Sequence, residues 1–291
     1  MTTTAVPILE DWMLSSPKTF NESFSGSEQE SRPIQGRVLV AEDNPSNQLV
    51  ATYMLEHIGY QADVVNNGIE AIEALKREKY DIILMDCQMP EMDGFEATRI
   101  IRESEVGSLH HISIIAMTAF ALKGDRDKCL KIGMNDYISK PVTIDVLKSK
   151  IEAVLSKDKD DDADENASPQ IPGEEPSIAP KVIAELLKLE ADGAHNVIDE
   201  LTAIFLTDSP LRLESIKNAI NEGNADELKH SAHALKGSCT VIGAMKMKEI
   251  CFELEKLGST SSLHNLSDTL SRLETEFLLV QRELTEKTWK K

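Results

Sequence analysis

Short apolar runs alternate with amphipathic stretches between residues 36 and 156. The apolar runs have the length and composition of strands and occupy residues 37–41, 61–65, 81–85, 113–117 and 137–139. The amphipathic stretches have the period of an α-helix and occupy residues 48–57, 68–76, 94–103, 123–132 and 144–155. Five strand–helix units in succession predict an α/β doubly wound domain, in which a five-stranded parallel sheet lies between two layers of helices.

The pattern changes after Pro180, where apolar residues recur at helical spacing and no strand-like run occurs. The helices predicted from this spacing occupy residues 182–189, 196–205, 211–221, 226–242, 245–257 and 263–286. Pro210 interrupts one long pattern and predicts a kink or a helix start, and Gly223, Gly243 and Gly258 punctuate the pattern between helices. Short breaks between amphipathic helices indicate an all-α antiparallel helical bundle.

Two further segments carry few apolar residues and are expected to lie outside both domains. Residues 1–35 are rich in Ser, Thr, Pro and Glu, and they are interpreted as a loose tail whose Trp12 cluster could also serve for docking. Residues 157–177 begin with an acidic run and indicate a flexible linker. The expected organisation is a disordered lead at 1–35, an α/β domain at 36–156, an acidic flexible linker at 157–177 and a helical bundle at 178–288.

The composition narrows the classes of function. The chain of 291 residues has a formal net charge of −19, whereas nucleic acid and anionic membranes bind basic faces, so neither is expected as the main partner. The first 30 residues lack the pattern of a signal peptide, and no apolar run reaches the roughly 20 residues that span a bilayer. The four cysteines lack zinc-site spacing. We expect a soluble cytoplasmic protein with reduced cysteines and no membrane insertion.

Polar side chains follow four of the predicted strands at the point where each strand ends. They are Glu42 and Asp43 after the first strand, Asp86 after the third, Thr118 after the fourth and Lys140 after the fifth. Because the C-terminal ends of parallel strands meet at one edge of the sheet, we expect these groups to lie together. Three close carboxylates need a cation, and oxygen ligands of this kind favour Mg²⁺ completed by a phosphate. Asp86 is then a nucleophile that forms an acyl phosphate, although taken alone it could simply cap a helix.

This pattern resembles the receiver domain of two-component response regulators, which has a flavodoxin-like fold, over residues 36–156. The matching segments are Glu42-Asp43-Asn44, Met85-Asp86-Cys87-Gln88-Met89-Pro90-Glu91-Met92-Asp93-Gly94, Ala116-Met117-Thr118-Ala119 and Ser139-Lys140-Pro141. The second segment is especially similar to receivers attached to hybrid histidine kinases.

The resemblance implies that Asp86 is the phosphoacceptor and carries 4-aspartylphosphate. It also implies that Mg²⁺ is held by Asp43, Asp86 and the main-chain carbonyl of Gln88, while Glu42 acts through water. These four residues are the expected metal site.

The resemblance gives three further residues a role. Thr118 and Lys140 are expected to bind the phosphoryl oxygens, and Tyr137 occupies the place of the aromatic residue that switches together with Thr118. Phe120 departs from the family, which usually has a small or polar residue there, and this leaves the rate of dephosphorylation open.

His233 is the histidine that the helical pattern singles out. The apolar residues opposite it on a helical wheel are Leu228, Leu235, Cys239 and Ile242. His233 is therefore expected at the centre of an exposed stripe, flanked by Lys229 and Lys236. Gly237 costs about 1 kcal/mol within a helix relative to Ala, and close approach of a partner would explain its presence. These surroundings suit a histidine that accepts a phosphoryl group, whereas a histidine without them is ordinarily only solvated.

The run His233-Ala234-Leu235-Lys236-Gly237-Ser238, followed by Gly243-Ala244, resembles the histidine phosphotransfer (HPt) domain over residues 178–288. The family implies phosphohistidine at Nε2 of His233, with Lys236 and Gly237 beside it.

The expected function is that of a phosphorelay intermediate in two-component signal transduction. The expected partners are an upstream histidine kinase and the receiver domain of a downstream response regulator. The sequence shows no ATP-binding kinase motif, so an enzyme is not expected. Two alternatives stay open: the C-terminal part of a hybrid sensor histidine kinase, and a phosphorylation-switched binding module in which His233 is a phosphate sink.

Overall fold

The computed structural model describes residues 34–107, 111–118, 123–156, 177–191, 196–260 and 266–287, without the side chains of residues 123–125. All of these residues belong to one unit, Ile34–Lys291. Trp12, Phe120, almost all of the predicted lead and almost all of the predicted acidic linker lie outside the described residues.

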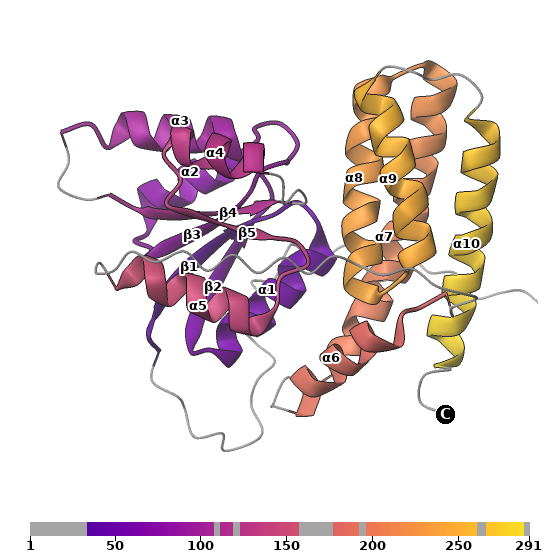
Figure 1. The fold of residues 1–291 in the computed structure, drawn as a ribbon, viewed down its shortest axis with the longest axis horizontal. Helices are drawn as coiled ribbons and strands as arrows, with labels where there is room; N and C mark the ends of the chain where they lie inside the picture. Colours follow the sequence, from indigo (N-terminus) through magenta and orange to yellow (C-terminus); the bar gives the residue numbers. More distant parts are fainter. Residues whose placement is uncertain are drawn as a thin grey trace, which may run out of the picture. The chain divides into compact units, whose positions relative to one another are not determined.

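Five parallel strands form one sheet in the order β2-β1-β3-β4-β5 (Figure 1). They are β1 (Gly36–Ala41), β2 (Tyr60–Val65), β3 (Ile82–Asp86), β4 (Ser113–Thr118) and β5 (Asp136–Ser139). In the register of the sheet, Ala41 pairs with Met85 and Met85 pairs with Ala116. The C-terminal ends of β1, β3 and β4 are therefore level, and the residues that follow them meet at one edge.

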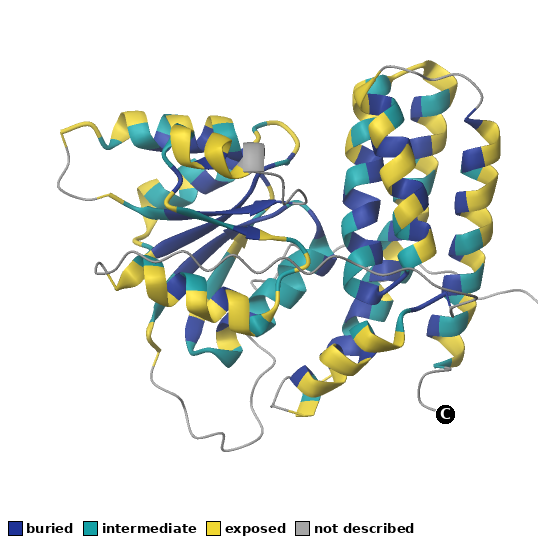
Figure 2. Cartoon of the chain, viewed as in Figure 1, coloured by how far each residue is buried: buried dark blue, intermediate teal, exposed yellow. Residues whose placement is uncertain are grey.

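Helices cover both faces of the sheet (Figure 1). The helices are α1 (Pro45–His57), α2 (Gly68–Arg77), α3 (Gly94–Ser104), α4 (Lys123–Ile132) and α5 (Ile144–Leu155). Alternate residues of β3 separate the two layers: Ile83 packs in a cluster with α2, α3 and α4, and Leu84 packs in a cluster with α1 and α5. All five residues of β3 are buried (Figure 2), as expected for a parallel strand covered on both faces. The predicted α/β doubly wound fold is confirmed.

The C-terminal part is helical, as predicted. Its helices are α6 (Pro180–Ala191), α7 (Val197–Glu222), α8 (Ala225–Ile242), α9 (Met245–Ser259) and α10 (Ser267–Glu286). They share a core in which Phe205 of α7, Leu235 of α8 and Leu273 of α10 are fully buried. The apolar stripe of each helix thus supplies the core, and the polar positions face outward (Figure 2).

The prediction of two helices separated at Pro210 is wrong, because α7 continues through this residue. Pro removes one main-chain donor, which weakens a helix locally. Phe205 before Pro210 and Ile216 after it both insert into the same core. Burial of both side chains keeps the backbone helical despite the missing hydrogen bond, so tertiary packing overrides local propensity.

The prediction that three glycines lie between helices is correct at two of the three positions. Gly223 and Gly243 follow α7 and α8 with φ of +70° and +83°, a conformation that favours glycine and ends helices. Gly258 instead lies inside α9, where a Cβ atom would stand 2.8 Å from the main-chain oxygen of Ala225 and 2.9 Å from the main-chain nitrogen of Lys229. Gly258 therefore permits the close packing of α9 against the start of α8.

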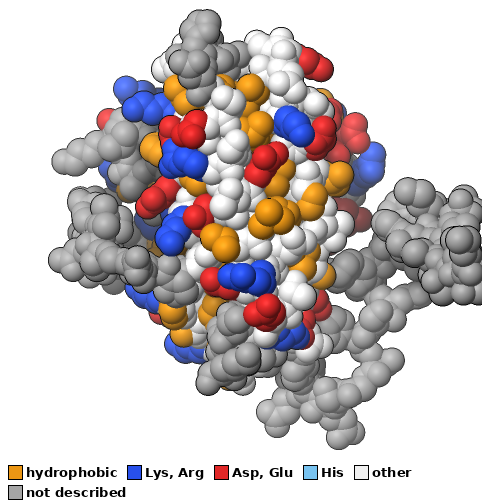
Figure 3. Space-filling model, turned by 90° about the vertical axis from the view of Figure 1, so that its right-hand side faces the viewer, with side chains coloured by type: hydrophobic (Ala, Val, Ile, Leu, Met, Phe, Trp, Pro, Cys, Tyr) orange, Lys and Arg blue, Asp and Glu red, His pale blue; other side chains and the backbone are white. Residues whose placement is uncertain are grey.

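The surface carries both signs of charge. Figure 3 shows Lys and Arg interspersed with Asp, Glu and single hydrophobic side chains on the face that it views. Among the described residues, no helix has the length and apolarity that a membrane crossing requires.

Candidate functional site

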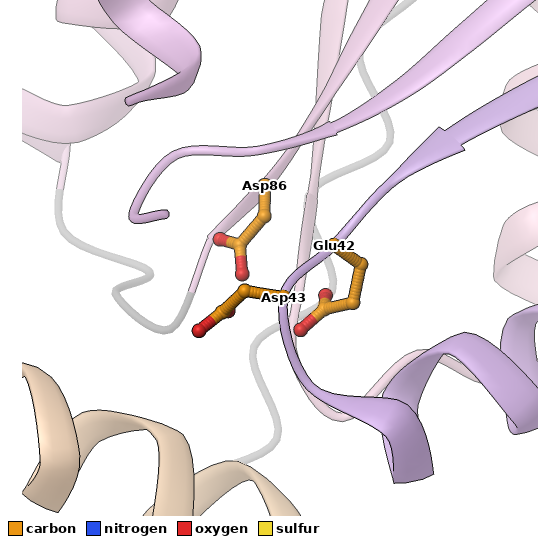
Figure 4. Close-up of side chains that lie close together, drawn as sticks. All are labelled: Glu42, Asp43 and Asp86. Carbon is orange, nitrogen blue, oxygen red and sulfur yellow. The ribbon is translucent and has the colours of Figure 1, made fainter. Parts of the chain in front are cut away.

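Three carboxylates converge at the C-terminal edge of the sheet (Figure 4). Glu42 and Asp43 directly follow β1, and Asp86 is the last residue of β3. One carboxylate oxygen from each residue lies within 4.8 Å of those of the other two. Glu42 and Asp86 are only 1% and 2% exposed. The parallel sheet thus brings together the three side chains that the sequence predicts as metal ligands.

Lys140 joins two of these carboxylates from the end of β5. Its Nζ atom donates a hydrogen bond to Oε2 of Glu42 and another to Oδ2 of Asp86, both at 2.6 Å. Asn47, in the first turn of α1, donates from Nδ2 to Oε1 of Glu42 at 2.7 Å. Lys140 therefore holds the cluster together, but one cation does not balance three carboxylates.

Burial, and after it the charges of the neighbouring groups, shift the pKa values of the cluster. Burial raises the pKa of Glu42 to about 8, and the charge of Asp86 adds to this effect while Lys140 opposes it. Burial also raises the pKa of Asp43, again with a contribution from Asp86. For Lys140, burial alone would lower the pKa, but the charges of Asp86 and Glu42 outweigh it and raise the pKa. The electrostatics therefore favour a second cation at this edge.

The remaining predicted receiver residues surround the cluster. The main-chain nitrogen of Gln88 donates to Oδ1 of Asp86 at 3.2 Å. Thr118 ends β4, is 5% exposed, and accepts a hydrogen bond at its main-chain oxygen from the main-chain nitrogen of Lys140. Tyr137 lies on β5, where it pairs with Ala116 of β4. Its side chain is partly buried in the cluster that contains α2, α3 and α4. Their roles in binding a phosphoryl group and in switching stay predictions.

A second group of polar side chains lies between α8 and α9. Nδ1 of His233 stands 2.7 Å from Oε1 of Glu255, and the other carboxylate oxygen of Glu255 accepts a short hydrogen bond from Nζ of Lys236. Lys236 is 7% exposed and Glu255 is 3% exposed. The three residues thus form a largely buried network that links the two helices.

Glu255 fixes the tautomer of His233. Burial alone would raise the pKa of Glu255, but the hydrogen bonds from His233 and Lys236, together with the charge of Lys236, lower it. An ionised carboxylate only accepts hydrogen bonds, so Nδ1 carries the proton and Nε2 keeps a free lone pair. Sequence reasoning missed Glu255. The available signal was a charged residue within the apolar stripe of α9 that includes Cys251 and Leu254.

The expected exposed stripe around His233 is only partly present. The residues predicted on the opposite side of α8 are buried as expected: Leu228, Leu235, Cys239 and Ile242. The side chain of His233, however, is only 13% exposed. The reason is that α1 lies against α8, where Nδ2 of Asn44 donates to the main-chain oxygen of Ala234 at 2.7 Å and to Oγ of Ser238 at 2.8 Å.

A cavity of about 200 Å³ lies where the two groups of polar residues face each other. Asp43 and Gln88 line it from one side, and His233 and Arg212 line it from the bundle. The positive charges of Lys140 and Arg212 oppose the rise of the pKa of Asp43. Sequence reasoning did not identify Arg212, which belongs to no chemical motif within its helix, and it gave Asn44 no role although Asn44 lies in the matching segment Glu42-Asp43-Asn44.

The comparisons with known proteins divide the chain in the same way. Residues 38–152 match the family model of the response regulator receiver domain, and residues 200–286 match that of the Hpt domain. The chain therefore carries a match to a receiver domain followed by a match to an Hpt domain, and we refer to it as the receiver–Hpt protein. Each match covers less than half of the chain, and the two matches follow one another along it.

Curated proteins similar to the chain include a sensor protein and a hybrid histidine kinase. Sensor protein GacS of Pseudomonas syringae pv. syringae is 30% identical over 251 residues, which is 82% of the receiver–Hpt protein and 27% of GacS. Hybrid signal transduction histidine kinase B of Dictyostelium discoideum is 45% identical over 130 residues, which is 41% of the chain and 7% of that kinase. The receiver–Hpt protein thus spans about a quarter or less of the length of these relatives.

Among solved structures, the receiver domain of sensor histidine kinase PA1611 from Pseudomonas aeruginosa is 44% identical, with a TM-score of 0.39. The match covers 42% of the receiver–Hpt protein and 98% of that domain, which has a magnesium ion coordinated in its active-site cleft.

Proposed function

We propose that the receiver–Hpt protein is a phosphorelay intermediate. Asp86 accepts a phosphoryl group from the phosphohistidine of an upstream kinase, His233 takes it from Asp86, and a downstream response regulator takes it from His233. The observation that supports this proposal is the presence in one chain of a carboxylate cluster joined by Lys140 and of a histidine whose Nδ1 faces a carboxylate and leaves Nε2 to react.

The donor set of the carboxylate cluster fits Mg²⁺, because its side-chain ligands are close oxygen atoms whose negative charge Lys140 does not fully balance. Glu42, Asp43, Asp86 and the main-chain carbonyl of Gln88 would hold the ion, which when bound neutralises charge on phosphoryl oxygens.

The residues of the chain itself supply positioning. Thr118 and Lys140 bind the oxygens of the phosphoryl group on Asp86, and Tyr137 moves together with Thr118. In the bundle, Lys236 orients Glu255, and Glu255 orients the imidazole of His233. Catalysis of this kind rests on orientation and charge neutralisation rather than on covalent chemistry by further groups.

Phosphotransfer profiling tests the proposal. Wild type, Asp86→Asn and His233→Gln are each incubated with phosphorylated histidine kinases and with phosphorylated response regulators. We expect Asp86→Asn to receive nothing from a kinase but to be labelled at His233 by a phosphorylated regulator. His233→Gln is expected to accept label at Asp86 and to pass none onward. Labelling of Asp86→Asn by the kinase would contradict the assignment of Asp86.

Matched variants control for damage to the fold. Asp93→Asn changes an exposed aspartate in the loop that follows Asp86, and it is expected to behave as wild type does. Because His230 lines the same cavity as His233, the neutral histidine control is His111→Gln, which changes a histidine of the receiver whose side chain is 60% exposed. Loss of the label on His233 only to water, with every regulator tested, would favour the alternative of a phosphate sink.

A second candidate setting is the C-terminal part of a hybrid sensor kinase. The 30% identity to GacS over both domains favours it, since GacS is much longer than the chain. The relay steps would be the same in that setting, and only the source of the phosphoryl group would lie in the same polypeptide.

A further inference from the structure

Asn44 connects the receiver to the helix that carries His233. It is the residue before α1 and is only 1% exposed. Its Oδ1 atom caps α1 by accepting hydrogen bonds from the main-chain nitrogens of Ser46 and Asn47. Its Nδ2 atom donates to Ala234 and Ser238, which lie one helical turn apart on α8. A single side chain thus caps α1 and also binds α8.

This contact sets the register between the two phosphoryl-accepting sites. Asp43 directly precedes Asn44, and His233 directly precedes Ala234. When Asn44 binds Ala234, the carboxylate cluster therefore comes to lie opposite His233. The cavity lined by both Asp43 and His233 is the space that this register leaves between them.

Gly237 permits the contact. A Cβ atom at this position would stand 3.1 Å from Nδ2 of Asn47 and 3.4 Å from Nδ2 of Asn44. The three nearest atoms to such a Cβ all belong to the receiver and none to the bundle. The absence of a side chain at Gly237 therefore makes room for Asn44 and Asn47 of the receiver.

Apolar contacts extend the same interface. Leu49, Val50 and Tyr53 of α1 pack against the core of the bundle, and the hydroxyl of Tyr53 donates to Oε2 of Glu200 at 3.0 Å. The interface thus combines buried apolar area with specific polar contacts, as stable protein interfaces do.

We propose that Asn44 is a positioning residue that holds the chain's own receiver on α8, so that the phosphoryl group passes from Asp86 to His233 within one chain and a second receiver reaches His233 only after this contact opens. The inference rests on the proposed function and adds to it the route of transfer. Joining donor and acceptor in one chain gives an effective concentration of about millimolar order, which favours the internal route.

The step balances without a further reactant. The lone pair of Nε2 of His233 attacks phosphorus, a P–N bond forms, and the P–O bond to Asp86 breaks with its electron pair on the carboxylate. No proton has to leave the imidazole. The positive charge that develops on the ring is shared with Nδ1–H, which faces the ionised Glu255.

The test uses full-length chains phosphorylated at Asp86 with phosphoramidate and Mg²⁺. Transfer to His233 is followed as the conversion of alkali-labile to alkali-stable label. Transfer within a chain is measured in the wild type at several protein concentrations. Transfer between chains is measured from phosphorylated His233→Gln to Asp86→Asn, because each of these variants lacks one of the two sites.

The key variant is Asn44→Ser, which keeps a side-chain oxygen to cap α1 but is too short to reach α8. Asn67→Ser is the matched control, since Asn67 is 5% exposed and caps α2 through Glu70 without touching the bundle. Label on His233 is expressed relative to the label first placed on Asp86, so that an effect on phosphorylation itself cancels.

The wild-type rate constant is expected to be independent of protein concentration. Two neutral hydrogen bonds correspond to roughly 10- to 100-fold in an equilibrium, so Asn44→Ser should slow transfer within the chain by about 10-fold or more. The same substitution in the Asp86→Asn acceptor should speed transfer between chains by about 5-fold or more, because it uncovers His233. Asn67→Ser should change neither rate.

A second readout needs neither phosphate nor metal. Diethylpyrocarbonate acylates accessible imidazoles, and mass spectrometry gives the rate at His233. Docking predicts slow acylation in the wild type and in Asn67→Ser, and about 5-fold faster acylation in Asn44→Ser.

The outcomes separate the two proposals. A wild-type rate that rises in proportion to protein concentration, or equal rates of transfer and acylation for Asn44→Ser and wild type, would overturn the inference and leave the relay intact. If acylation behaves as expected but no label reaches His233 within or between chains, the docking stands and the proposed function fails.

Discussion

Nδ1 of His233 lies 2.7 Å from Oε1 of Glu255, a residue of the neighbouring helix α9. This relationship decides the tautomer of the imidazole, because the carboxylate only accepts hydrogen bonds. In the proposed relay it also places a negative charge beside the ring that would become positive when His233 is phosphorylated. Glu255 therefore acts on the phosphoryl group only through His233.

Replacing Glu255 should slow phosphorylation of His233 without removing it. A hydrogen bond to a charged group contributes about 1.5–3 kcal/mol, so Glu255→Ala is expected to reduce the rate by about 10- to 100-fold. Glu255→Gln keeps an oxygen acceptor and should be less severe. Rapid-quench kinetics with a phosphorylated regulator, recorded from pH 6 to pH 9, gives both the rate and its pH profile. Wild-type kinetics in Glu255→Ala would show that Glu255 has no part in orienting His233.

The same residue predicts a pH dependence of stability. The pKa of Glu255 in the folded protein is below its ordinary value of 4.5. Its interactions therefore stabilise the fold at pH values above 4.5, and this contribution is lost as the pH falls through the lower, folded pKa. We expect the free energy of unfolding of wild type to exceed that of Glu255→Gln near pH 7, and the difference to shrink as the pH is lowered below 4.5. Urea denaturation of both proteins from pH 7 to pH 3.5 measures it. A difference that grows on acidification would contradict the assigned direction.

Removing Lys140 should destabilise the receiver in a way that a divalent cation corrects. Lys140 is 16% exposed and bonds two carboxylates that are almost fully buried. Loss of one partner from a buried ionic group costs about 3–5 kcal/mol, and Lys140→Ala should approach this cost in EDTA. Mg²⁺ should restore part of the loss, because a bound cation offsets the same charges.

Denaturant unfolding with EDTA and with Mg²⁺ checks this expectation. Lys150→Ala is the control, since Lys150 pairs with Asp136 nearer the surface and should cost at most about 1 kcal/mol. An equal loss of unfolding free energy for Lys140→Ala in both solutions would show that Lys140 and the cation do not neutralise the same carboxylates.

Two glycines on neighbouring helices should respond differently to alanine. A Cβ atom at Gly258 would clash with main-chain atoms of Ala225 and Lys229, so Gly258→Ala should lower the free energy of unfolding by about 1–3 kcal/mol. Gly237→Ala meets only the ends of receiver side chains and gains helix propensity, so its effect should stay within about 1 kcal/mol. Thermal unfolding of the two variants provides the comparison, and equal losses would be inconsistent with the packing described.

The carboxylate site could be predicted from the sequence because topology alone assembles it. Parallel strands place their C-terminal ends at one edge, so Glu42, Asp43 and Asp86 had to meet once five strand–helix units were recognised. The opposite case is Glu255, which lies 22 residues from His233 on another helix. Its role depends on how α9 rotates against α8, and helical periodicity within one segment does not determine that rotation.

The coverage of His233 could not be predicted for a related reason. Periodicity correctly placed Leu235 on the core side and His233 on the other side of α8. It cannot state what else lies against that other side, and Asn44 is 190 residues away from Ala234. Likewise, α7 continues through Pro210 because the core holds both of its halves. This packing cannot be inferred from local helix propensity.

Asn44 shares a peptide bond with Asp43, so the end of β1 belongs to two equilibria at once. One is the binding of a ligand by the carboxylates, and the other is the association of the receiver with α8. Equilibria that share a structural element are linked reciprocally: if a ligand at the carboxylates changes the docking constant by some factor, docking changes the affinity for that ligand by the same factor. Through the three consecutive residues Glu42-Asp43-Asn44, the charge state of the receiver and the accessibility of the histidine would then be coupled by one free energy.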